Sequence, residues 1–79
     1  MRKILVCEDE AAIREFVVFN LQKAGFEVAE AATGEDAVSL FEKQDDFDIA
    51  LLDLMLPGID GIEVCKRLRS KSDRVGIIM

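Results

Sequence analysis

Asp53 is the acidic residue whose place in the sequence points most directly to chemistry. It follows a nearly continuous apolar run, Ile49-Ala50-Leu51-Leu52, and Pro57 and Gly58 soon end the extended segment. Such a run is typical of a parallel strand covered on both faces. Because burying an ionised carboxylate there would be very costly, we expect Asp53 to lie at the carboxyl end of the strand, facing solvent. In open parallel sheets, ligands bind at that end.

A second group of acids follows another short apolar run near the start of the chain. Lys3-Ile4-Leu5-Val6-Cys7 predicts a first strand, and Glu8, Asp9 and Glu10 close it. In the doubly wound strand order 2-1-3-4, the first and third strands are neighbours and their carboxyl ends form the switch point where ligands bind. With this topology, Glu8, Asp9 and Asp53 converge although they are far apart in the sequence.

Three converging carboxylates repel one another and therefore favour a bound cation or a proton. Two like charges about 4 Å apart repel by about 1 kcal/mol in water and about 4 kcal/mol at an intermediate dielectric. Oxygen ligands with open positions suit Mg2+, which commonly binds one or two carboxylates together with a phosphate. Such an ion would offset the repulsion between Asp53 and an incoming phosphoryl group, leaving one carboxylate oxygen as a nucleophile. The alternative is that Asp9 only caps a helix and Asp53 only ends a strand.

The segments between these acids predict how they are positioned. Apolar residues recur at three- and four-residue steps from Ala11, which predicts an amphipathic helix of about 15 residues. Asp9 is suited to cap its start, and Gly25 is suited to the left-handed position after its end. The apolar run is wider than one stripe, so we expect Val18 or Phe19 to face another neighbour. The residues expected to face the core are Ile13, Phe16, Val17, Leu21 and Ala24.

The rest of the chain continues the alternation of strands and helices. Glu27–Ala31 predicts a short edge strand, and Thr33 with Asp36 predicts the capped start of a second helix. A third helix follows Gly61, and Val75–Met79 predicts a fourth strand. The apolar residues that mark the third helix are Ile62, Cys65 and Leu68. This alternation predicts one α/β domain over residues 1–79 with a parallel sheet and right-handed crossovers, for which we take the doubly wound strand order 2-1-3-4.

Composition restricts the class of protein. With 51% hydrophobic and 33% charged residues, the 79-residue chain is typical of a soluble globular domain. No apolar stretch reaches the roughly 20 residues of a bilayer span, and no signal-peptide cleavage pattern is present, so we expect a cytoplasmic protein with no membrane contact. The net charge of −6 argues against direct nucleic-acid contact. Cys7 and Cys65 lie in apolar patterns, which favours buried side chains over zinc or redox chemistry.

Glu8-Asp9-Glu10 after a hydrophobic strand, together with Asp53-Leu54-Met55-Leu56-Pro57-Gly58-Ile59-Asp60-Gly61, resembles the response-regulator receiver domain of two-component signalling. The resemblance extends from the first strand to the fourth and implies a flavodoxin-like fold. It implies that Asp53 is the phosphoacceptor and that Asp9 binds Mg2+ directly. Glu8, where the family often has Asp, would act through coordinated water, and Met55 would contribute its backbone carbonyl to the metal. The implied partner is a sensor histidine kinase.

The resemblance also implies what the 79 residues lack. The family has a hydroxyl residue after strand four, a lysine after a fifth strand, and two further helices, none of which has a counterpart here. Thr33 cannot replace that hydroxyl because it follows strand two. We therefore expect a receiver domain truncated before its fifth strand. It would be a phosphoacceptor and not an enzyme, since any self-catalysed phosphorylation or dephosphorylation needs the missing residues.

Other classes fit the same residues less well. A phosphohydrolase that forms an aspartyl phosphate would have a second acid where Met55 stands, and a dinucleotide binder would have a Gly-rich loop after the first strand. The remaining alternative is a non-signalling half-domain or scaffold fragment of a receiver domain that self-associates. Because Val75–Met79 is an edge without charge or proline, we expect a homo-oligomer, of which a two-fold dimer is the simplest form.

Overall fold

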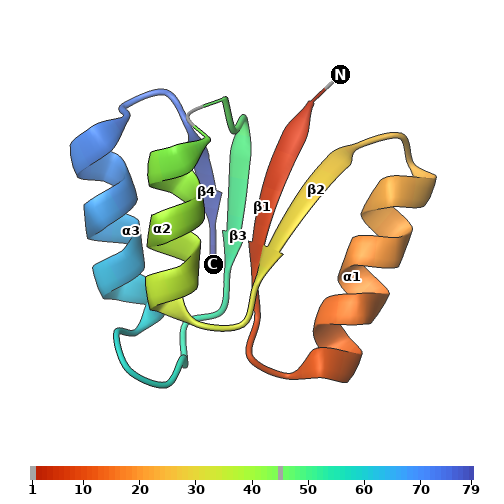
Figure 1. Ribbon diagram of the computed structural model, residues 1–79, viewed down its shortest axis with the longest axis horizontal. Helices are drawn as coiled ribbons and strands as arrows, with labels where there is room; N and C mark the ends of the chain where they lie inside the picture. Colours follow the sequence, from red (N-terminus) through yellow and green to blue (C-terminus); the bar gives the residue numbers. More distant parts are fainter. Residues whose placement is uncertain (1, 45) are drawn as a thin grey trace.

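Four short strands alternate with three helices, and all four strands lie parallel in one sheet (Figure 1). The computed structural model describes residues 2–44 and 46–79. The order across the sheet is β2-β1-β3-β4, the doubly wound order expected in the sequence analysis. The elements are β1 (Lys3–Cys7), α1 (Ala11–Lys23), β2 (Glu27–Ala31), α2 (Gly34–Lys43), β3 (Ile49–Leu52), α3 (Gly61–Lys71) and β4 (Gly76–Ile78).

The register of the central pair determines where the site lies. β1 pairs with β3 so that Cys7 is opposite Leu52, and β1 pairs with β2 so that Cys7 is opposite Ala31. The residues that follow Cys7 and Leu52 therefore leave the sheet side by side. The edge strand β4 pairs only with β3 within the described sheet.

The two faces of the sheet are covered unequally. α2 and α3 lie on one face and α1 lies alone on the other (Figure 1). The larger core contains Leu5, Ala50, Val64 and Leu68, none of which exposes any surface. Burying a leucine or valine contributes about 1.5–3 kcal/mol, so this face carries most of the hydrophobic stabilisation. The smaller core under α1 consists of Ile4, Val6 and Val18, with partly buried neighbours.

The predicted core stripe of α1 is partly wrong. Val18 is its buried residue and Val17 and Leu21 are half-buried, whereas Ile13 and Phe16 are 46% and 71% exposed. The helix packs alone against β1 and β2, so only one narrow stripe finds a partner. The stripe of α3 also differs from the prediction, since Val64 and Leu68 are buried with Gly61 and the predicted stripe residue Ile62 is 51% exposed.

Helix ends follow local sequence with one exception. Gly25 has φ +99° just after α1, and the Thr33 hydroxyl accepts the Asp36 N–H at 3.1 Å at the start of α2, as predicted. Asp60 caps α3 by accepting the Glu63 N–H at 2.9 Å. The prediction that Asp9 caps α1 is wrong. Glu10 occupies the capping position and makes no side-chain capping bond. The Asp9 carboxylate cannot serve as the cap because it lies beside Glu8 and Asp53.

The described helices are also short. None of them is long and apolar enough to cross a membrane.

Candidate metal and phosphoacceptor site

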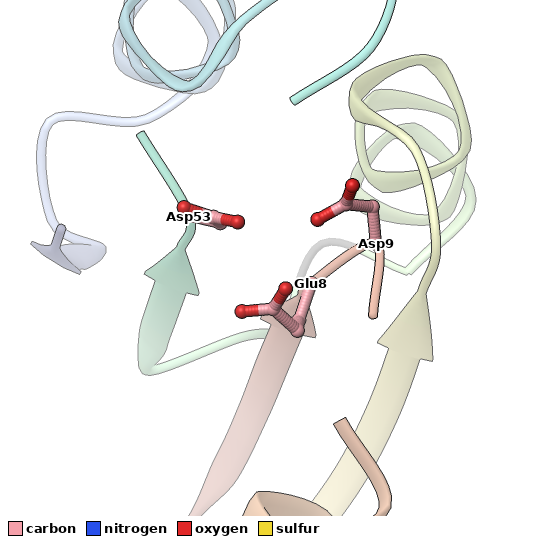
Figure 2. Close-up of side chains that lie close together, drawn as sticks. All are labelled: Glu8, Asp9 and Asp53. Atoms are coloured by element: carbon pink, nitrogen blue, oxygen red, sulfur yellow. The ribbon is translucent and has the colours of Figure 1, made fainter. Parts of the chain in front are cut away.

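The carboxyl ends of β1 and β3 bring three acids together. The Asp53 N–H donates to the Cys7 carbonyl at 3.0 Å, and the Glu8 N–H donates to the Ala31 carbonyl at 3.1 Å, so both residues are fixed to the end of the sheet. Glu8, Asp9 and Asp53 each offer one carboxylate oxygen, and these oxygens all lie within 4.8 Å of one another. Figure 2 shows the three side chains reaching into one space from two loops. The predicted convergence is therefore present.

The three carboxylates differ in their exposure to solvent. Glu8 and Asp53 are half-buried and Asp9 is exposed, so the cluster lies at the surface with its base against the sheet. Asp53 Oδ1 accepts the Met55 N–H at 3.2 Å, which orients the carboxylate and keeps the Met55 main chain beside it. The Met55 side chain is 79% exposed.

Burial and neighbouring charges shift the pKa of Glu8. Desolvation raises this pKa, and the nearby Asp9 and Asp53 carboxylates raise it further, while the hydrogen bond from the Glu10 N–H to Glu8 Oε2 opposes the shift. The folded protein thus favours a proton, or a cation in its place, at the Glu8 carboxylate. The carboxylate oxygens are hard ligands with open positions, so the residues fit a hydrated divalent ion such as Mg2+.

Cys7 lies directly beneath the cluster but does not belong to it. Burial raises the pKa of its thiol to about 11, and the charges of Asp53 and Glu8 add to the shift. The Sγ atom contacts the Thr33 carbonyl oxygen at 3.3 Å. A neutral, buried thiol is a poor metal ligand, so Cys7 serves as a small core residue. Cys65, also free, is half-buried against the main core, as predicted for both cysteines.

The loop from Asp53 to Gly61 holds Asp53 in place, and two glycines make its path possible. Gly58 has φ +74°, a conformation that other residues rarely adopt. A Cβ atom at Gly61 would collide with the Asp53 carbonyl oxygen and come within 3.0 Å of Leu54 Cα. The loop also borders an open groove of about 670 Å3 that begins at Asp9 and is lined by Leu54, Met55 and Ile62 among others.

Sequence reasoning missed one residue that contacts the site from behind. Arg14 lies between the apolar residues of α1 that were expected to face the core, yet its side chain is only 18% exposed and it donates to the Glu8 carbonyl. The only signal in the sequence was a basic residue five positions after Asp9, which is too common a pattern to predict a contact.

The comparisons with known proteins identify the family. The family model of the response regulator receiver domain matches residues 4–79. This chain belongs to that family. The receiver domain is 39% identical, with a TM-score of 0.94, to the response regulator TrrA of Thermotoga maritima in complex with Mg2+-BeF, covering 100% of this chain and 68% of that one.

Two further solved structures extend the comparison. The complex of the histidine kinase ThkA with TrrA matches at 39% identity and a TM-score of 0.89, covering 98% of this chain and 66% of that one. A CheY-like receiver domain from Methanospirillum hungatei matches at 29% identity and a TM-score of 0.96, covering 100% and 62%. The receiver domain described here thus spans about two thirds of the length of these relatives, and its flavodoxin-like strand order agrees with theirs.

Proposed function

We propose that Asp53 accepts a phosphoryl group from a histidine kinase in a reaction that requires Mg2+. The observation that carries the proposal is the convergence of the Glu8, Asp9 and Asp53 carboxylate oxygens within 4.8 Å. Two structures of one relative, TrrA, support it: one is a complex with Mg2+-BeF and the other a complex with the histidine kinase ThkA. The open groove beside Asp9 leaves room for a partner protein to approach the site.

Each residue has a distinct role in this proposal. A carboxylate oxygen of Asp53 forms a new bond to phosphorus while the donor's bond to phosphorus breaks, and the electron pair of that bond leaves with the donor. Asp9, Asp53 and the Met55 carbonyl hold the metal ion, and Glu8 acts through coordinated water. When bound, Mg2+ supplies positive charge that offsets repulsion between the carboxylates and the phosphoryl oxygens. The receiver domain is the acceptor, and the kinase is the enzyme.

Replacing Asp53 by Asn tests the assignment. The protein is incubated with Mg2+ and a small-molecule phosphodonor, and the base-labile phosphoprotein is measured with time. Wild type should be labelled and Asp53→Asn should not. Asp73→Asn changes an exposed carboxylate in the α3–β4 loop and should be labelled like wild type. Labelling of Asp53→Asn at the wild-type rate would show that another residue is the acceptor.

The same proposal includes a cytoplasmic location and no direct contact of this segment with nucleic acid. The net charge of −6 disfavours direct contact of this segment with the phosphate backbone of DNA or RNA. We propose that the receiver domain acts in the cytoplasm, where it would meet the kinase that donates the phosphoryl group.

A second candidate function, a self-associating fragment that does not signal, is favoured by one surface. Ile78 and Met79 are 57% and 53% exposed at the free edge of the sheet. They border a hollow of about 170 Å3 that is also lined by Val17 and Leu51, on the face where α1 lies alone. β4 carries no charge that would prevent pairing with another strand. Two copies of β4 would pair antiparallel across a two-fold axis and cover these side chains together.

Light scattering over a range of protein concentrations separates the two candidates. Self-association predicts an average mass that rises from monomer toward dimer in the micromolar range. Ile78→Lys, at the exposed edge, should keep the protein monomeric. A wild-type protein that stays monomeric at high micromolar concentration contradicts self-association and leaves phosphotransfer as the sole candidate.

A further inference from the structure

Arg14 connects three elements directly behind the acidic cluster. Its Nη1 atom donates to the Glu8 carbonyl oxygen at 2.9 Å, and its Nε atom donates to Glu30 Oε1 at 3.1 Å. Arg14 lies on α1, Glu8 follows β1, and Glu30 lies on β2. The Arg14 side chain is 18% exposed, so the two bonds are shielded more than an ordinary surface pair. One guanidinium therefore joins the helix, the loop and the edge strand.

These bonds complete the support of Glu8. Its N–H donates to the Ala31 carbonyl at 3.1 Å, its side chain accepts the Glu10 N–H at 3.1 Å, and its carbonyl accepts from Arg14. Glu8 thus has a partner on each of its polar groups before any ligand binds. The start of α1 has no side-chain cap of its own, so the path of the loop depends on these contacts.

The loop needs such support because its side chains repel Asp53. Carboxylates of like charge within 4.8 Å move apart unless the main chain holds them in place. A guanidinium is suited to this position because its planar group donates to two acceptors at fixed geometry, which a lysine ammonium cannot do as well.

We infer that Arg14 is a positioning residue that holds Glu8 and Asp9 toward Asp53 and thereby sets the affinity of the site for a divalent cation. The inference rests on the proposed function, since it assumes that this cluster is the Mg2+ site. Arg14 itself touches neither the cation nor the phosphoryl group. It acts through the Glu8 carbonyl.

The test measures the dissociation constant for magnesium chloride by NMR titration of the folded protein, following the amide signals of Glu8 and Asp9. Arg14→Gln should weaken Mg2+ binding by about tenfold, the low end of what is typical when a group supporting a metal ligand is removed. Arg14→Lys should lie between wild type and Arg14→Gln. Glu30→Gln keeps the bond to Glu8 and turns the second anchor from an ion pair into a weaker, neutral hydrogen bond, so it should weaken binding by a smaller factor in the same direction.

Arg67→Gln is the matched control. It breaks an arginine–glutamate pair of similar length, Arg67 Nε to Glu63 Oε2 at 3.0 Å on α3, and should bind Mg2+ like wild type. Unfolding by urea is measured for every variant. A merely structural role for Arg14 would lower the unfolding free energy and leave the dissociation constant of the folded protein unchanged, and that result overturns the inference. If Arg14→Gln does not fold, Glu30→Gln and Arg14→Lys decide the same question.

Failure of the inference and failure of the proposed function give different results. If Asp9→Asn abolishes Mg2+ binding and Arg14→Gln binds as tightly as wild type, the site is correct and the role of Arg14 is wrong. If Asp9→Asn and Asp53→Asn both bind Mg2+ like wild type, the cation site lies elsewhere and both proposals fail.

Discussion

Lys3 shows how one side chain can connect segments that are distant in the sequence. Its ammonium lies 3.0 Å from Asp46 Oδ1, 3.7 Å from Glu27 Oε2 and 4.9 Å from the centre of the Phe47 ring. The first strand is thereby joined to the second strand and to the segment that leads into β3. The hydrogen bond between Lys3 and Asp46 lowers the pKa of Asp46 and raises that of Lys3, so both groups keep their charges over a wide pH range.

The sign of these shifts predicts a pH dependence of stability. Asp46 has a lower pKa in the folded state than its ordinary 3.8, so its contribution is present above that pH and is lost as the pH falls through the folded value. The Lys3 contribution is present below pH 10.5 and is lost as the pH rises through its raised folded value. Asp46→Asn should therefore lower the unfolding free energy by a constant amount between about pH 5 and pH 9, and the difference should shrink in acid.

Urea unfolding of wild type and Asp46→Asn at a series of pH values measures this difference. Asp73→Asn, in an exposed loop, should follow wild type at each pH and shows whether net charge alone has an effect. A wild-type advantage that grows as the pH falls below 3.8 would contradict the assignment.

At the scale of elements, the loop between β3 and α3 decides where the proposed phosphoacceptor Asp53 lies. Asp53 begins the loop, and its end at Gly61 returns to pack against the Asp53 carbonyl. The Gly61 N–H donates to the Leu54 carbonyl at 3.1 Å, and the Ile59 N–H approaches Glu35 Oε2 at 3.4 Å. The loop is therefore closed on itself and attached to the start of α2. Its shape depends on the absence of a side chain at Gly61.

Gly61→Ala should destabilise the protein and weaken the site together. The added methyl would meet backbone atoms that cannot rotate away, and forcing extra volume into a packed site costs about 1–3 kcal/mol. Urea unfolding gives the stability, and labelling by a phosphodonor gives the effect on Asp53, which we expect to fall at least tenfold because the carboxylate is displaced.

Gly76→Ala provides the comparison for that prediction. A Cβ atom at Gly76 would come no closer than 3.6 Å to the Asp48 carbonyl oxygen, an ordinary contact. This variant should therefore label at the wild-type rate with nearly unchanged stability. If the two alanine variants behave alike, the close approach at Gly61 does not control the site.

At the scale of the whole molecule, Mg2+ binding and folding should be coupled. The repulsion among three carboxylates opposes folding in the absence of metal. A bound cation attracts all three, so the net electrostatic contribution of the cluster then favours folding. Free Mg2+ at a hundredfold excess over its dissociation constant should stabilise wild type by about 2.7 kcal/mol. Asp9→Asn removes one charge and one ligand, so it should be more stable than wild type without metal and should gain little when Mg2+ is added.

Thermal or urea unfolding with and without magnesium chloride measures both effects. Calcium-free buffer with a chelator defines the metal-free state. The prediction requires the stability curves of wild type and Asp9→Asn to cross as Mg2+ increases. Parallel curves would mean that Mg2+ acts on the protein at other positions.

The local sequence pattern alone determined the strands and helices of this protein and placed its candidate site residues at the carboxyl ends of two strands. The apolar runs before Glu8 and Asp53 identify two parallel strands because a strand covered on both faces needs apolar side chains in succession. Helical periods between them predict right-handed crossovers in a parallel sheet, and the order 2-1-3-4 that the structure has is one of the two common orders of such sheets. Once that order is known, the convergence of Glu8, Asp9 and Asp53 follows from the geometry of parallel sheets.

Tertiary structure decided which way individual side chains face. Asp9 is a residue type that commonly caps helices, but its carboxylate lies with Glu8 and Asp53, and Glu10 occupies the cap position. Phe16 fits the helical period, yet it is 71% exposed because α1 packs only against β1 and β2. The contact of Arg14 with Glu8 and Glu30 depends on three elements meeting at one point. Sequence spacing along one element carries no information about such contacts, because their energy depends on partners that only the folded chain brings together.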